Sequence, residues 1–375
     1  MALEARVVSA ILAIFLLPCP AQAEERWRIQ FFYDKPDSVL QISDLECPTA
    51  RHCVASGWIV DKKGREKGAL LLTSDGGEHW SLEEVGEHPL SIFLLNDSLG
   101  WMVTDRGIWS TDDGGPTWTK QLAVKGMLRA HFVNAERGFA IGSPRAIYET
   151  VDGGKKWTKL AAAEREPAAS INTVYDCIAF LGEHGVIVGK VAPQQDGRDP
   201  IWLNPATARA QRQQNSTSIM LETFDGGKTW KSSVNPTFGD VTEMLITKSG
   251  FALALVEYHD YFSLPSSVLK VEFGVAKPLV VFAKRDRAVS DIALLDDGGA
   301  LLASIQPPGN SNQVPIPGKL RMLRSKNLSD WAEEEVDYRA VAQRAVIAAP
   351  DSKHAWVATD TGMILTVTRD ENAAR

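Results

Sequence analysis

A turn-forming motif with the pattern Thr-x-Asp-Gly-Gly-x-x-Trp occurs four times in this sequence, and it constrains the fold more than any other feature. The copies span residues 73–80, 111–118, 150–157 and 223–230. Their Asp residues lie 38, 39 and 73 positions apart, and an insertion at about 192–217 accounts for the long third step. A period of about 40 residues with one turn per repeat is typical of a propeller or a solenoid.

The chemistry of the motif indicates a hairpin. Each copy follows a short apolar or β-rich run, and Asp-Gly then favours a tight turn because Gly accepts a positive φ and the Asp carboxylate accepts nearby backbone N–H groups. The Trp starts the return strand and packs against the turn. We expect a structural role, since identical acids spread around a repeat array cannot all serve one catalytic or metal site. The positions are Asp75, Trp80, Asp113, Trp118, Asp152, Trp157, Asp225 and Trp230.

The motif also carries a family resemblance. Ser/Thr-x-Asp-x-Gly-x-x-Trp resembles the Asp-box, or BNR repeat, of bacterial sialidases and related propellers. The longer pattern, in which Gly100-Trp101 and an apolar strand precede the turn, resembles the photosystem II stability/assembly factor family and its relatives in non-photosynthetic bacteria. That resemblance implies a β-propeller with a chaperone-like role on a nascent membrane protein. Many unrelated activities share such repeats, so the motif predicts fold better than function.

We predict an all-β, seven-bladed β-propeller over residues 24–375. Segment 27–32 precedes the first blade and has strand composition, so we expect it to supply the outer strand of the seventh blade and close the ring. The expected blades cover about 39–85, 90–122, 127–160, 171–234, 241–282, 289–336 and 341–367.

Residues 1–23 have the features of a secretory signal peptide. An apolar run at 7–17 is followed by a Pro-containing break and by Ala21-Gln22-Ala23, a small-x-small cleavage site. The run is shorter than a membrane span, and no second long apolar stretch follows. We therefore expect an exported protein, periplasmic or extracellular, with no transmembrane segment in the mature chain.

The cysteines fit an oxidising compartment. Cys47 and Cys53 flank a short turn between two expected strands, which indicates a local disulfide in the first blade. The alternative is two unpaired buried thiols. Cys177 lies in an apolar strand with no obvious partner, and we expect a buried free thiol there.

Few residues indicate catalysis. The seven His residues show no metal-ligand spacing, and there is no phosphate loop or dinucleotide fingerprint. The Arg-Ile-Pro motif of sialidases is not present; the nearest string is Arg28-Ile29-Gln30. The net charge of −7 argues against nonspecific nucleic-acid binding. We expect a noncatalytic protein without cofactor or metal, and a carbohydrate-active enzyme or lectin of the sialidase-like type stays open as the alternative.

Two regions are candidate binding sites. One polar position recurs in each expected inner strand, at Gln41, Ser91, Arg129, Asp176, Thr242, Asp291 and Arg344. Its charged members predict a mixed-charge channel mouth formed by Arg129, Asp176, Asp291 and Arg344. The second region is the 192–217 insertion, where Trp202 lies in an apolar triplet within polar sequence. We therefore predict a monomeric exported scaffold that binds a protein partner, as an assembly or stability factor for a membrane or envelope complex. A glycan is the alternative ligand.

Overall fold

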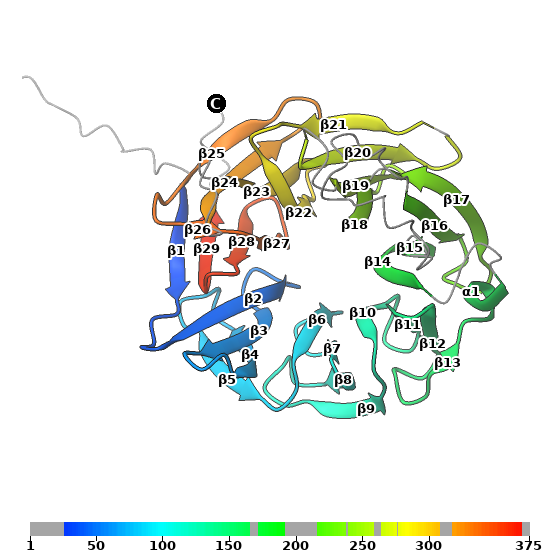
Figure 1. Ribbon diagram of the computed structural model, residues 1–375, viewed down its shortest axis with the longest axis horizontal. Coiled ribbons are helices and arrows are strands. Elements are labelled where there is room, and N and C mark those ends of the chain that lie inside the picture. Colours follow the sequence, from blue (N-terminus) through cyan, green and yellow to red (C-terminus); the bar gives the residue numbers. More distant parts are fainter. Residues whose placement is uncertain are drawn as a thin grey trace, which may run out of the picture.

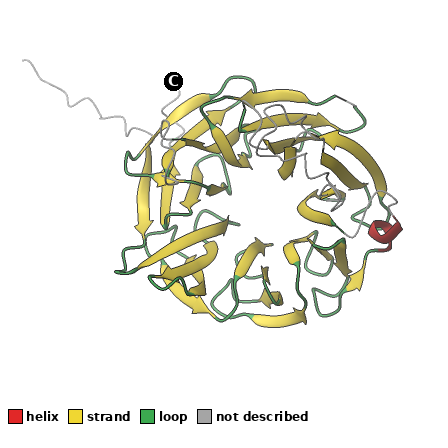
Figure 2. Ribbon diagram, viewed as in Figure 1, coloured by secondary structure: helices red, strands yellow, loops and turns green. Residues whose placement is uncertain are grey.

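The computed structural model of the chain describes residues 26–165, 172–191, 216–237, 239–258, 264–275, 277–307 and 317–369. The predicted signal peptide (1–23), Trp202 and most of the 192–217 insertion lie outside the described residues. The described part is an all-β propeller whose sheets follow one another in chain order around a central axis (Figure 1). Strands dominate, and one short helix, α1 (Ala161–Arg165), lies at the periphery (Figure 2).

Five sheets have four antiparallel strands each, and each sheet is built from consecutive strands beginning nearest the axis. The first contains β2 (Ser38–Glu46), β3 (Cys53–Asp61), β4 (Glu66–Thr73) and β5 (Ser81–Val85). The second contains β6 (Pro89–Leu94), β7 (Gly100–Thr104), β8 (Gly107–Thr111) and β9 (Thr119–Ala123). The third contains β10 (Met127–Phe132), β11 (Gly138–Gly142), β12 (Ala146–Thr150) and β13 (Thr158–Lys159). The fourth contains β14 (Thr173–Leu181), β15 (His184–Val191), β16 (Ser216–Thr223) and β17 (Lys231–Thr237). The fifth contains β18 (Gly239–Ile246), β19 (Phe251–Tyr258), β20 (Ser266–Glu272) and β21 (Leu279–Ala283).

The remaining strands form one nine-stranded sheet. Its order is β22 (Ala288–Leu294), β23 (Ala300–Gln306), β24 (Gly318–Ser325), β25 (Ala332–Val336), β1 (Arg26–Phe32), β29 (Met363–Thr368), β28 (His354–Thr359) and β27 (Ala345–Ala348), with β26 (Val341–Ala342) paired to β24. The structure therefore differs from seven separate blades. The reason is β1, which pairs antiparallel with β29 as segment 27–32 predicts, but also parallel with β25.

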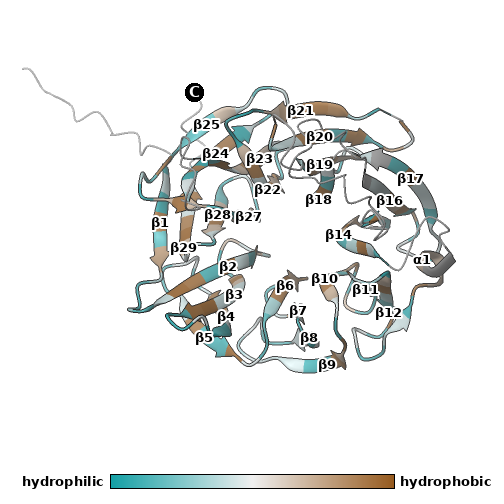
Figure 3. Cartoon of the chain, in the orientation of Figure 1, coloured by the Kyte–Doolittle hydropathy of each residue, from teal (hydrophilic) through white to brown (hydrophobic). Residues whose placement is uncertain are grey.

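The hydrophobic core is divided among the interfaces between neighbouring sheets. One cluster, for example, brings Val54 and Leu70 of the first sheet against Ile92 and Met102 of the second. Middle strands such as β7 and β11 are buried along their whole length because sheets cover both of their faces. Hydrophobic residues accordingly lie on the strands, whereas many connecting loops are polar (Figure 3). Among the helices that the structure describes, none has the length and apolar character needed to cross a lipid bilayer.

Each Asp-Gly-Gly turn is held by its own Thr and Asp. In the third copy, Thr150 Oγ1 donates to Asp152 Oδ1 (2.9 Å) and accepts from the N–H of Gly154 (2.9 Å), while Asp152 also accepts from the N–H of Lys156. Both glycines of every copy have positive φ, as the sequence predicts. The Trp157 indole donates to the carbonyl of Gly154 (2.8 Å). Equivalent bonds occur for Trp118 and Trp230, whereas the buried indole N–H of Trp80 has no hydrogen-bond partner among the described residues.

These turns mark one face of the ring. The first glycine of each motif donates its N–H to a carbonyl in the turn between the first two strands of the same sheet. The four bonds are Gly76 to Arg51, Gly114 to Ser98, Gly153 to Glu136 and Gly226 to Glu183. The carboxyl ends of the inner strands therefore lead to the face that carries the Asp-Gly-Gly turns.

Candidate functional site

A β-bulge interrupts six of the inner strands at equivalent places. The strand register shifts between Ile42 and Asp44 in β2, and a shift at the same place occurs in β6, β10, β14, β18 and β22. A bulge inserts one residue and re-aims the side chains that follow it. The residues directly after the six bulges are Asp44, Ser91, Arg129, Cys177, Glu243 and Asp291.

Five of these six residues line a cavity of about 380 Å³ at the centre of the ring, which we call the channel cavity. Its lining continues with the residues that follow each bulge, including Glu46, Phe93, His131 and Phe180. The sixth position, Cys177, is fully buried in the core between β14 and β18, where burial raises the pKa of its thiol well above the usual range. The channel cavity therefore lies between the bulges and the face that carries the Asp-Gly-Gly turns.

An ion pair spans the channel cavity. Arg129 Nη1 lies 2.7 Å from Glu243 Oε2, so β10 is joined to β18 across the intervening strand β14. The negative charge of Glu243 raises the pKa of Arg129, which stays cationic at every physiological pH. A charge-assisted bond of this kind is among the stronger contacts in a protein interior.

Asp44 and Asp291 connect neighbouring sheets through their carboxylates. Asp44 accepts the N–H groups of Leu45 (2.9 Å) and of Ile92 on the next inner strand (2.8 Å). Asp291 repeats the arrangement with Ile292 (2.8 Å) and with Ile347 on β27 (2.7 Å). Each carboxylate therefore fixes the spacing of two inner strands at the bulge.

The carboxyl groups of Asp44, Glu46 and Asp291 in the channel cavity have raised pKa values. Burial, reinforced by the negative charge of Glu243, raises the pKa of Asp291 to about 8. Burial also raises the pKa of Asp44, and burial together with the charge of Asp44 raises the pKa of Glu46 well above its usual range. Burial is the main physical cause, and such shifts concentrate at functional sites.

Aromatic side chains form another part of the lining. The imidazole of His131 lies between Phe93 and Phe180, with ring centroids 4.4 and 5.5 Å apart. Burial lowers the pKa of His131 to about 4, so the imidazole is neutral at pH 7. The channel cavity thus combines four carboxyl groups, one guanidinium group and an aromatic stack.

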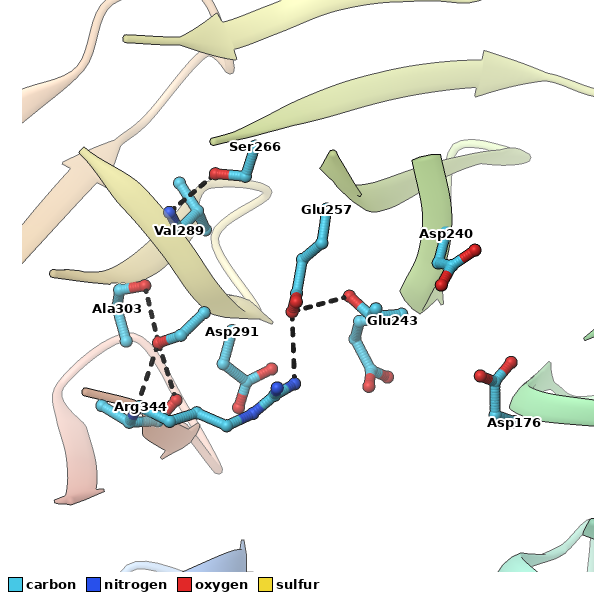
Figure 4. A network of polar contacts seen from close by, with 12 residues as sticks. Asp176, Asp240, Glu243, Glu257, Ser266, Val289, Asp291, Ala303 and Arg344 are labelled. Atoms are coloured by element: carbon cyan, nitrogen blue, oxygen red, sulfur yellow. Dashed lines mark hydrogen bonds and ion pairs between the residues drawn. The ribbon is translucent and has the colours of Figure 1, made fainter. Parts of the chain in front are cut away.

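The structure separates the four residues predicted for the channel mouth into two pairs. Arg129 and Asp291 line the channel cavity. Arg344 instead reaches past β22 to Glu257 of β19, 3.2 Å away (Figure 4). Asp176 pairs with Lys190 at 3.1 Å, outside that lining. Asp176 is the inserted residue of its bulge, so its side chain departs from the direction that strict alternation predicts.

Three further lining residues escaped the sequence argument. Asp44, Glu46 and Glu243 lie in inner strands, but the alignment of polar positions selected Gln41 and Thr242 in their place. Thr242 is the inserted residue of its bulge and lies one position before Glu243, whereas Gln41 lies three positions before Asp44. The polar positions of these two strands were therefore out of register with the bulges, which leave no distinctive residue type in the sequence. Trp202, the remaining candidate, lies outside the described residues.

Comparisons with known proteins bear on the predicted resemblance. The family model described as photosynthesis system II assembly factor YCF48 matches residues 122–194. A search of curated protein sequences finds no match. The resemblance to the photosystem II assembly factor family is confirmed, and the matched segment includes α1 and strands of the third and fourth sheets.

Solved structures share the fold over nearly the whole chain. YCF48 bound to D1 peptide is 18% identical with a TM-score of 0.59, and the match covers 95% of this chain and 99% of that one. YCF48 from Cyanidioschyzon merolae is 17% identical, with a TM-score of 0.54 and coverage of 91% and 98%. The extracellular domain of the putative hybrid two component system BT4673 from B. thetaiotaomicron is 10% identical, with a TM-score of 0.57 and coverage of 92% and 40%. At these identities the likeness shows a common propeller fold.

Proposed function

We propose that this chain is an exported, noncatalytic propeller that binds a segment of a protein partner and assists assembly of a membrane or envelope complex. The observation that carries the proposal is the channel cavity, where charged, hydrogen-bonding and aromatic groups from six inner strands converge on the axis. Convergent polar groups in a preformed hollow are the usual architecture of a ligand site. The match with YCF48, one structure of which contains a D1 peptide, supports a protein segment as the ligand.

We also propose that the nine-stranded sheet corresponds to two propeller blades, which makes seven in the ring. Strands β22 to β25 would form one blade, and β27, β28, β29 and β1 the other. The antiparallel pairing of β1 with β29, from Arg28 opposite Thr366 to Phe32 opposite Met363, supports this division. The parallel contact of β1 with β25 is shorter, with two residue pairs, Arg26 with Glu335 and Trp27 with Val336.

The test is capture of membrane proteins from an envelope extract by the immobilised mature chain, followed by mass spectrometry. The decisive variant is Arg129→Gln, because it removes the only guanidinium group in the lining of the channel cavity. We expect reproducible capture of subunits of one complex, and capture by the variant should differ at least fivefold from capture by the wild type. Lys67→Ala, at an exposed ion pair with Glu84 on the outer strands, is the matched control.

Two outcomes would contradict the proposal. One is equal capture by Arg129→Gln, with folding verified by an unchanged circular dichroism spectrum. The other is binding or cleavage of sugars on a glycan array and a fluorogenic glycosidase panel with no protein captured, which would favour the carbohydrate-active alternative.

A further inference from the structure

Acidic side chains outnumber basic ones in the channel cavity. Its ionisable lining consists of Asp44, Glu46, Glu243 and Asp291 against Arg129, which already pairs with Glu243. The side chain of Glu46 has no hydrogen bond or ion pair with any other described residue. A cation that enters the cavity lowers the pKa of the carboxyl groups around it and so favours their ionised, negatively charged form.

A second and independent feature is the hydroxyl group of Ser91. Ser91 occupies the same post-bulge position as Asp44, Arg129 and Asp291, and it lines the same cavity. Its side chain is 7% exposed, and the buried Oγ has no hydrogen-bond partner within the part of the chain that the structure describes. Buried polar atoms are nearly always paired, so an unpaired oxygen in the lining of a hollow points to a missing donor.

The aromatic stack suits the same kind of ligand. Phe93 and Phe180 lie on either side of His131, which is neutral at pH 7. None of the three rings therefore carries a positive charge that would repel a cation. Aromatic faces attract cations, and the planar guanidinium group of arginine stacks on them particularly well.

The spacing of the carboxylates distinguishes an organic cation from a metal ion. Throughout the described ranges, a single group of three residues, Asp75, Glu78 and His79, brings potential ligand atoms within 4.8 Å of one another. The channel carboxylates are not among them, so no three of these carboxylates bring their oxygens together as ligands of one ion. A guanidinium or ammonium group, which carries several N–H donors, can reach separate oxygens instead.

We propose that the channel cavity binds the guanidinium or ammonium group of a basic residue in an extended segment of the partner. Glu46 and the Ser91 hydroxyl accept its N–H groups, and the rings of Phe93 and Phe180 pack against its apolar stem. A volume of about 380 Å³ lies at the lower end of the range for ligand pockets and suits one long side chain. This inference rests on the proposed function, because it names the chemistry of the segment that the propeller binds.

Labelled nine-residue Gly-Ser peptides with one central variable residue provide the test, read by fluorescence polarisation with the mature chain. The central residue is arginine, its neutral isostere citrulline, or glutamate. We expect the arginine peptide to bind about tenfold more tightly than the citrulline peptide, because it adds charge-assisted hydrogen bonds. Glu46→Gln should remove most of that difference. Glu83→Gln, an exposed carboxylate on the outer strand β5, should preserve it.

Other outcomes overturn the proposal. Equal affinity for the arginine and citrulline peptides, or an unchanged preference in Glu46→Gln, would show that the carboxylates do not select a cation. Spermidine is a further arm, and its binding more tightly than the arginine peptide would assign the cavity to a free polyamine. If none of the peptides binds but envelope subunits are captured specifically, the cationic segment is rejected and the proposed function stands. If the arginine peptide binds selectively but no subunits are captured, the proposed function is rejected and the cation preference of the cavity stands.

Discussion

The indole N–H of Trp27 donates a 2.7 Å hydrogen bond to the carboxylate of Glu334, 307 positions further along the chain. Arg369 completes the arrangement, because its Nη2 lies 2.7 Å from Glu334 Oε2 and its guanidinium group lies over the Trp27 ring at 5.7 Å. Trp27 is fully buried and the Arg369 side chain is 3% exposed. One carboxylate therefore joins the first strand, the outer strand β25 and the end of β29.

Replacement of Trp27 tests the contribution of β1 to stability. Trp27→Ala removes a fully buried indole and its hydrogen bond, and we expect a loss of about 3–5 kcal/mol in the free energy of unfolding. Trp27→Phe retains most of the packing and should cost less, although Glu334 loses one donor. Urea unfolding followed by circular dichroism measures both values. An unchanged midpoint for Trp27→Ala, or for deletion of residues 24–33, would contradict a closing role for β1.

Thr150→Val should weaken the third Asp-Gly-Gly turn without altering its shape. Thr150 is 2% exposed. Its hydroxyl group donates a hydrogen bond to Asp152 and accepts one from the N–H of Gly154. Its removal leaves that buried N–H without an acceptor, and we expect a cost of about 2 kcal/mol. Thr150→Ser, which retains the oxygen, is the control. A loss as large in Thr150→Ser would assign the effect to packing of the methyl group instead.

The raised pKa of Asp291 predicts a pH dependence of stability. The folded protein holds this proton up to about pH 8, whereas the unfolded chain releases it near the ordinary aspartate pKa of 3.8. The native state therefore binds more protons in that window, and the contribution of Asp291 to stability falls as pH rises from about 4 to about 8. Charged groups facing it are Glu243, Arg129, Asp44 and Glu46.

Unfolding free energies measured at intervals from pH 4 to pH 9 check this slope. Asp291→Asn should flatten it, even if the amide lowers stability at every pH by facing the N–H groups of Ile292 and Ile347. A slope in Asp291→Asn as steep as in the wild type would assign the titration to the other carboxyl groups.

The disulfide between Cys47 and Cys53 closes a loop with a sequence separation of 6. The chain-entropy model predicts that so short a loop adds about 2 kcal/mol to stability. Reductant should therefore lower the free energy of unfolding by about that amount, and the double variant Cys47→Ala, Cys53→Ala should not respond to reductant. Cys177→Ala should respond as the wild type does, and a loss of response there would implicate Cys177 in disulfide exchange.

The sequence was most informative where structure is local. The Thr, Asp and Gly residues of each turn contact partners within four positions, so their spacing alone predicts the hairpin. The charged centre is different, because Arg129 and Glu243 are 114 positions apart and meet only when the sheets surround the axis. The bulges are a second obstacle to prediction, because they turn the side chains of Glu243 and Asp176 away from the direction that the alternation of side chains along a regular strand predicts. This is why the propeller fold could be predicted while half of the predicted channel residues lie elsewhere.

The place of β1 in the nine-stranded sheet has a consequence for the order of folding. Its antiparallel partner, β29, begins at Met363, and its parallel partner, β25, ends at Val336. β1 leaves the ribosome before every other strand that the structure describes, and it therefore has no neighbour to pair with until β25 and β29 have been made. Until then its apolar residues and both of its edges are open to other chains, so the interval between synthesis and ring closure is when this protein most needs protection from aggregation.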